Sequence, residues 1–257
     1  MDHGCEPYNA ILIQMRLKNL CNTITSKNSL VQFDAMKPLI ILIVSLGVGA
    51  ALTVSHIAAA AQSKVSSEDP NCLNLHLGYG PFNYNTARGR AHWKIVEEYH
   101  FTPSVQRLQH GHTASIPQDL DYTLRAFPNQ PLALYDMAKY QLAHGYPLGG
   151  TYNSVHYVRA ECYFKRAIRF APKDGVVRML YGIYLQRKGD HKAALKRYKQ
   201  AEKLINPKRA AELHYDMGLL YLKMKDYAKA REQAKRAYSE GYPLPGLRKQ
   251  LQAVGEW

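Results

Sequence analysis

The sequence predicts an all-α fold, a solenoid of stacked helical hairpins with an irregular, partly helical N-terminal cap and a C-terminal capping helix. Three observations support this fold class. Stretches of the second half of the chain recur at a spacing of 36 residues, proline follows the second helix of each copy, and the residues before the repeats differ from them in composition. A fixed period of this length is typical of repeat proteins, in which each unit buries its apolar face against the next.

The two clearest copies are residues 180–207 and 216–243. Small and helix-ending residues recur between them at the same spacing, and the matching pairs are Gly182 and Gly218, Ala194 and Ala230, Ala201 and Ala237, and Pro207 and Pro243. Glycine and alanine allow two helices to approach closely. Proline ends a helix because it cannot donate the backbone hydrogen bond, so we expect the second helix of each unit to stop at Pro172, Pro207 or Pro243.

An earlier copy is split by a longer loop. Its first helix is predicted over residues 130–145 and its second over 160–172, with the loop at 145–157 between them. Residues 121–131 look like the tail of a still earlier unit. We therefore expect about three and a half repeats within a repeat domain at 117–257.

The same stretches resemble a known family. "MGLLY" at Met217–Tyr221 is close to the L-G-x-x-Y signature of the tetratricopeptide repeat, and Ala160, Phe164, Ala167 and Pro172 follow the pattern of its second helix. The resemblance covers about half of the chain. Shorter stretches such as "YGPFNY" and "GYPLPGLR" are similar to exported bacterial tetratricopeptide repeat proteins of unassigned role, which implies a compartment more than an activity.

Residues 36–61 have the features of a secretory signal peptide. Lys37 supplies a positive charge, residues 38–54 are almost entirely apolar, and small residues follow before Gln62. We expect the mature chain to begin near Gln62 and to be periplasmic or secreted. The alternative is a retained inner-membrane anchor through 38–54, since this run is at the lower length limit for spanning a bilayer.

Residues 1–35 show no apolar period and no motif. They are interpreted as a mis-assigned or unstructured extension before Met36, with an unusually long n-region as the other interpretation. Removal of the signal peptide leaves Cys72 and Cys162, and an even pair in an exported chain predicts a disulfide. Two buried free thiols are the alternative.

Residues 62–116 are predicted to form the N-terminal cap. They begin with a polar linker and a turn-rich aromatic loop, and residues 91–101 are expected to form a short helix with Trp93, Ile95 and Val96 on one side. Thr102 and Pro103 are expected to begin another helix.

The groove lined by the first helices of the repeats is the expected binding site. Helical geometry selects eleven residues for it: Tyr135, Lys139, Leu142, Met179, Ile183, Gln186, Arg187, Tyr215, Leu219, Leu222 and Lys223. Their aromatic, aliphatic and basic side chains suit a protein or peptide ligand with apolar anchors and some acidic character. The alternative is that the aliphatic members only pack against neighbouring helices.

The positive charge lies on the repeats. Residues 154–257 contain 23 Lys and Arg against 10 Asp and Glu, whereas residues 62–153 contain seven of each kind. Lys192, Lys196, Lys199 and Lys203 form a stripe at helical spacing, which we interpret first as a solvated face and second as a contact for an anionic membrane surface or acidic partner. Nucleic acid is not expected, because the chain has a signal peptide and no recognition motif.

Catalysis is not expected. The chain has no G-x-S-x-G motif, no H-E-x-x-H motif and no phosphate-binding glycine loop, and neither a cofactor nor a small-molecule substrate is predicted. His110 and His112 give a weak metal signal without a third ligand at fixed spacing. The sequence therefore predicts an exported scaffold that binds a protein or peptide in the cell envelope. The alternative is a metal-binding or catalytic accessory protein with a histidine site in residues 76–112.

Overall fold

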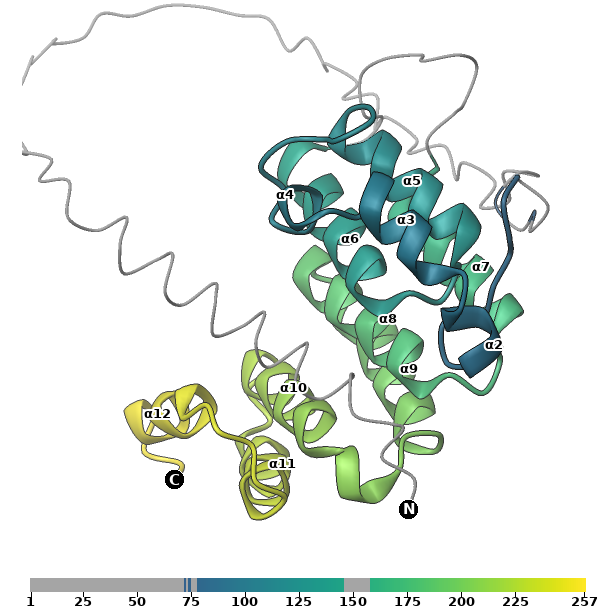
Figure 1. The fold of residues 1–257 in the computed structure, drawn as a ribbon. Coiled ribbons are helices and arrows are strands. Elements are labelled where there is room, and N and C mark those ends of the chain that lie inside the picture. Colours follow the sequence, from purple (N-terminus) through teal and green to yellow (C-terminus); the bar gives the residue numbers. More distant parts are fainter. Residues whose placement is uncertain (1–71, 73, 75–77, 146–157) are drawn as a thin grey trace, which may run out of the picture. The chain divides into compact units, whose positions relative to one another are not determined.

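The computed structural model describes residues 72, 74, 78–145 and 158–257, and this part of the chain is helical without strands (Figure 1). The predicted extension at 1–35 and the predicted signal peptide at 36–61 lie outside the described residues, as does most of the 145–157 loop. The all-α prediction is confirmed.

Four helices form and adjoin the N-terminal cap: α2 (Ala87–Arg90), α3 (Trp93–Tyr99), α4 (Pro103–Gln106) and α5 (Ile116–Ala126). α3 is the helix predicted over residues 91–101, and α4 begins at Pro103 as expected. The predicted apolar side of α3 is wrong for Ile95, which is 54% exposed while Val96 is buried. Trp93 and Val96 are three residues apart and share a helix face, whereas Ile95 lies off it.

The cap has its own aromatic core. Tyr84, Val96 and Phe127 are buried together, and Trp93 packs its ring edge-on against the Phe127 ring at a centroid distance of 5.1 Å. The backbone of the cap also runs close to α5, since Phe82 N donates to Ala126 O at 2.8 Å. Gly80 permits this approach: its φ is +102°, and a Cβ there would lie 2.5 Å from Ala126 O.

Three helical hairpins follow. Their bounds are α6 (Pro131–His144) and α7 (Ala160–Phe170), α8 (Gly175–Lys188) and α9 (His191–Glu202), and α10 (Ala211–Lys223) and α11 (Tyr227–Ser239). The members of each pair contact each other, and the first helices α6, α8 and α10 contact in sequence. This is the arrangement of a hairpin solenoid.

The helix ends show how short turns are made. Asp174, Asp190 and Asp226 each accept a hydrogen bond from the backbone three residues later, and so cap the N-termini of α8, α9 and α11. The predicted role of Pro207 needs correction, because α9 already ends at Glu202 and Pro207 instead begins the 3-10 helix η3 (Pro207–Arg209). Proline suits the first turn of a helix, because backbone N–H groups there have no intrahelical acceptor and the N–H that proline lacks is not needed.

The two predicted contact glycines have different neighbours. A Cβ on Gly182 would lie 2.5 Å from the Tyr198 ring of α9, so this glycine is where the two helices of one hairpin meet. A Cβ on Gly218 would lie 2.4 Å from a terminal methyl of Leu247, which belongs to the last helix, α12 (Gly246–Ala253). Leu247 and Leu251 are fully buried and α12 contacts α10 and α11, as predicted for a C-terminal capping helix.

Candidate partner-binding groove

The first helices of two neighbouring repeats are joined by a predicted pair of groove residues. Arg187 of α8 donates from Nη2 to the hydroxyl of Tyr135 on α6 at 2.9 Å, and its guanidinium lies 5.2 Å from the centre of the Tyr135 ring. A hydrogen bond together with a cation–π contact fixes both side chains. Tyr135 and Arg187 therefore form one rigid polar and aromatic element on the side of the solenoid formed by the first helices.

The eleven predicted groove residues differ in burial. Four are buried: Tyr135, Met179, Ile183 and Tyr215. Four are half-buried: Lys139, Gln186, Leu219 and Leu222. Three are exposed: Leu142, Arg187 and Lys223. A partner can contact the last two groups directly. Leu142 is the most informative of these, because a leucine that is 39% exposed has apolar surface to offer.

Two of the eleven side chains are used within the chain. Gln186 accepts a hydrogen bond from the Tyr198 hydroxyl of α9 at 2.7 Å. The Tyr215 ring stacks on the Tyr242 ring with a centroid distance of 4.1 Å, and Gly246 lies against its hydroxyl. Tyr215 thus holds the C-terminal segment onto α10, a role that sequence spacing did not indicate.

Met179 lines a cavity of about 220 Å³ at the N-terminal ends of α8 and α10. Its apolar walls include Val176 and Ile205, and its polar lining includes Lys173 and Glu212. The lining comes from two repeat turns and from Asn85 of the cap. Sequence reasoning placed Met179 in the groove but could not find this cavity, because its walls are far apart in the chain.

Asp174 connects the cap to the repeats beside this cavity. Its Oδ1 accepts from Val177 N at 3.1 Å, while Oδ2 accepts from the side-chain amides of Asn85 at 2.8 Å and Asn129 at 3.2 Å. Asn129 in turn accepts from Tyr84 N at 3.0 Å. One aspartate therefore caps α8 and holds the cap segment at the same time.

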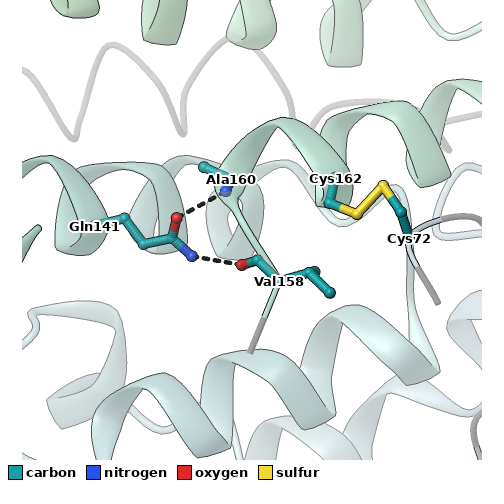
Figure 2. The surroundings of a disulfide bond; sticks show 5 residues. All are labelled: Cys72, Gln141, Val158, Ala160 and Cys162. Carbon is teal, nitrogen blue, oxygen red and sulfur yellow. Dashed lines mark hydrogen bonds between the residues drawn. A yellow bond between two sulfur atoms is a disulfide. The ribbon is translucent and has the colours of Figure 1, made fainter. Parts of the chain in front are cut away.

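The two cysteines left after residue 61 are brought together. Figure 2 shows the Cys72 and Cys162 side chains joined through their sulfurs, with Cα atoms 5.1 Å apart, a spacing that suits a disulfide. Cys162 lies on α7 and both residues are buried. The two predicted cysteines therefore lie within the Cα distance that a disulfide needs, and the bond itself stays a prediction.

A glutamine holds the start of α7 close by. Figure 2 shows the side-chain amide of Gln141, near the end of α6, bridging two backbone groups: Nε2 donates to Val158 O at 2.9 Å and Oε1 accepts from Ala160 N at 2.7 Å. The amide replaces the backbone partners that the first turn of a helix lacks. Nothing in the sequence pattern indicated this contact.

The histidines of the cap are separated. His110 and His112 are exposed; His110 Nδ1 lies 2.9 Å from Gly111 O, and His112 uses its backbone N to donate to Asp119. Within the described ranges no group of three or more His, Cys, Asp or Glu side chains is arranged to hold a metal ion. Another histidine of the cap, His100, has a carboxylate partner: its Nδ1 lies 3.0 Å from Asp119 Oδ1.

The lysine stripe lies on the outer side of α9. All four lysines are exposed: Lys192, Lys196, Lys199 and Lys203. Glu202, at the end of the same helix, receives a hydrogen bond from Arg236 of α11 at 2.9 Å. Exposed lysines fit both interpretations of the stripe, a solvated face and a contact for an anionic surface or acidic partner.

The described part of the chain contains no helix that is both long enough and apolar enough to cross a membrane. The predicted apolar run at 38–54 lies outside that part.

The arrangement defines a class of protein: a solenoid of antiparallel helical hairpins closed by a cap at each end. Within it, residues 175–239 match the family model described as tetratricopeptide repeat, and these bounds coincide with the start of α8 and the end of α11. The match covers the second and third hairpins, within the repeat region that the sequence predicts. Such repeats are interaction modules, and their presence indicates a scaffold for protein–protein contacts. A search of the curated proteins finds no match to the chain.

Proposed function

We propose that this chain is an exported scaffold, not an enzyme, whose repeats bind a protein or peptide partner in the cell envelope. The observation that carries the proposal is the run of first helices α6, α8 and α10, which contact in sequence and present the predicted groove residues on neighbouring elements. The family match supports the binding class, because tetratricopeptide repeats are interaction modules.

The exposed and half-buried groove residues set the chemistry of the ligand. Leu142, Leu219 and Leu222 offer apolar surface, while Arg187 and Lys223 add positive charge. An extended or helical peptide with apolar anchors and acidic residues complements this set. The basic repeats also favour an acidic partner over a basic one through long-range attraction.

Affinity capture from an envelope extract tests the groove with a matched pair of double variants. Leu222→Ser with Lys223→Ala alters α10, a first helix of a hairpin. Leu195→Ser with Lys196→Ala makes the same changes on α9, a second helix, where the leucine is likewise half-buried and the lysine likewise exposed. We expect the α9 variant to retain the partner captured by the parent chain and the α10 variant to lose most of it. Equal retention by both would refute the groove assignment.

Export is the second part of the proposal, and it depends on the signal-peptide features of residues 36–61. N-terminal sequencing of the protein from the envelope fraction tests it. A first residue near Gln62 supports cleavage and a periplasmic or secreted chain, and a chain that retains 38–54 in the membrane fraction supports the anchor instead. Recovery in the cytoplasm with the segment intact would overturn export.

An oxidising compartment would also allow the Cys72–Cys162 bond to persist. In the proposed scaffold this bond ties the N-terminal segment to α7 and keeps the cap in place over the first repeat.

A further inference from the structure

The N-terminal cap contains a second cavity, of about 230 Å³, away from the first helices of the repeats. Among the described residues, six line it: Tyr79, Ile95, Val96, Tyr99, His100 and Tyr122. They come from the segment before α2, from α3 and its end, and from α5. We call it the aromatic cavity.

The lining is unusually apolar for a surface site. Tyr79, Ile95 and Tyr99 are 40%, 54% and 48% exposed, so three large apolar side chains face solvent around one hollow. Single exposed apolar residues need no explanation, but several gathered around a concavity mark a binding site. The cap core does not require them there, since it is filled by Tyr84, Val96 and Phe127.

The aromatic cavity has one polar group that is held in a fixed orientation. The His100 ring stacks on the Tyr122 ring with a centroid distance of 3.6 Å, and its Nδ1 lies 3.0 Å from Asp119 Oδ1. Asp119 is buried and acidic, so Nδ1 carries the proton and donates to it. In the neutral ring Nε2 then has the lone pair, and the described residues supply no hydrogen-bond partner for it.

Asp119 is well supported as a carboxylate. Burial by itself raises its pKa, but hydrogen bonds from His100, from the Thr113 hydroxyl at 2.5 Å and from backbone N–H groups, including His112 N at 2.7 Å, lower it below the ordinary value. The Asp119 carboxylate accepts a hydrogen bond from Nδ1, and its negative charge makes Nε2 a stronger hydrogen-bond acceptor. Carboxylates bonded to metal-ligating histidines raise the basicity of the ring in the same way.

From this geometry we infer that the aromatic cavity binds a tyrosine or tryptophan side chain of a partner segment, with the ring against the apolar walls and its O–H or N–H donating to His100 Nε2. The cavity size suits one ring. The ligand ring is planar and apolar with a single donor. This matches aromatic and aliphatic walls on which the His100 Nε2 acceptor is held in a fixed orientation.

A sugar ring fits the same lining less well. Each of its several hydroxyls needs a partner, whereas Ile95 and Val96 offer none. The polar atoms of the described lining are those of the His100 ring and of three tyrosine hydroxyls, and the Tyr79 hydroxyl already lies 3.1 Å from His92 Nδ1. The aromatic cavity is separate from the groove, so this site stands or fails independently of the groove assignment.

Nuclear magnetic resonance titration of the full-length chain with N-acetyl-L-tyrosinamide tests the inference directly. We expect saturable shifts of the Ile95 and Val96 methyl signals and of the His100 ring protons. N-acetyl-L-phenylalaninamide lacks the donor and should bind about fivefold more weakly, the effect of one hydrogen bond.

Two variants separate the contribution of the hydrogen bond to binding from the contribution of the apolar walls. His100→Asn keeps a donor for Asp119 at the place of Nδ1 but removes Nε2, so it should bind both amides with equal, weak affinity. Ile95→Ser should weaken the binding of both amides. Met224→Ser, which changes another exposed apolar residue (43% against 54% for Ile95) outside the cavity, should leave binding unchanged.

Three results would overturn the inference. They are the absence of saturable shifts at the cavity, an undiminished preference for the tyrosine amide in His100→Asn, and tighter binding of N-acetylglucosamine than of either amide. The last result would assign the cavity to a carbohydrate.

Discussion

At the scale of single residues, the same helical position has different neighbours in different repeats. Gly182 and Gly218 are 36 residues apart in sequence, but the first lies against a fully buried aromatic ring and the second against the flexible end of a leucine. Sequence periodicity predicts that both positions are small. The neighbouring side chain decides how strictly that must hold.

Substitution of each glycine by alanine should separate the two cases. Alanine gains about 1 kcal/mol of helix propensity at both positions. At Gly182 the Tyr198 ring cannot move aside. Gly182→Ala should therefore lower the free energy of unfolding by about 1–2 kcal/mol, after the gain in helix propensity has been subtracted from the cost of the clash. Gly218→Ala should lower it by less than Gly182→Ala does, because its close contact is one terminal methyl of Leu247, which can shift more easily than a ring even though Leu247 is buried. Urea unfolding measures both, and an equal loss in the two variants would contradict this explanation.

Asp136 is a second residue whose context decides its behaviour. It is buried in α6, its Oδ2 has no hydrogen-bond partner among the described residues, and burial raises its pKa well above the ordinary value while nearby Lys139 lowers it only in part. The protonated form is therefore favoured in the folded chain. Stability from this group is present at pH values below the unfolded pKa near 4 and is lost as the pH rises toward the raised one.

Asp136→Asn should remove that pH dependence. Relative to the parent chain, the variant should gain about 1 kcal/mol of stability between pH 4 and neutral pH, because only the parent must bury or neutralise a carboxyl group. Thermal unfolding at a series of pH values measures the difference. A constant difference between the two chains at every pH would show that Asp136 does not titrate in this window.

At the scale of helices, caps and hairpin contacts explain where each element begins and ends. The aspartates before α8, α9 and α11 follow a recognisable sequence rule, since aspartate is a favoured N-cap residue. The start of α7 has no such residue: its N-cap is Arg159, without a side-chain cap hydrogen bond, and Gln141 of the preceding helix takes over that role. The α6–α7 pair therefore depends on one buried amide.

Gln141→Leu should destabilise this pair selectively. It leaves the carbonyl of Val158 and the N–H of Ala160 without their partner, and we expect a loss of about 2–4 kcal/mol. Gln250→Leu on α12 is the control, because Gln250 is exposed and should change stability by less than about 0.5 kcal/mol. Hydrogen exchange at the start of α7 should accelerate in the first variant; unchanged exchange there would exclude the clamp.

At the scale of the described chain, long-range links fasten the cap to the repeats. Asp174 receives side-chain hydrogen bonds from Asn85 and Asn129, and Cys72 is joined to Cys162 across 90 residues of sequence. Both links tie the N-terminal segment to elements of the first and second hairpins. A solenoid needs such closure, because an uncovered terminal repeat exposes its apolar face.

Loss of the cysteine pair should therefore reduce stability without changing the fold. Closing a loop of this length contributes at most about 4–5 kcal/mol on chain-entropy grounds. Cys72→Ser with Cys162→Ser should unfold at lower denaturant concentration, and reductant should shift the parent chain to the same midpoint but leave the variant unchanged. Mass measurement after alkylation provides the independent check: two alkylatable thiols in the native exported protein would exclude the bond.

Most of the repeat architecture could be predicted, and most of the candidate sites could not. The 36-residue period and the small residues indicate helices and their pairing, because the packing repeats with the sequence. The proline signal failed at Pro207, which begins η3 after α9 has already ended. The apolar side of α3 was misplaced at Ile95, and the role of Tyr215 in holding the C-terminal segment was missed, because each depends on which neighbour covers the residue.

The sequence by itself determined the fold class and the hairpin units of the repeats, since these follow from local periodicity. Only the tertiary structure decided which side chains form sites. The cavity beside Met179 and the aromatic cavity around His100 each combine segments that are far apart in the chain. Helix propensity and spacing act over a few turns, whereas a cavity is defined by the walls that long-range packing brings together.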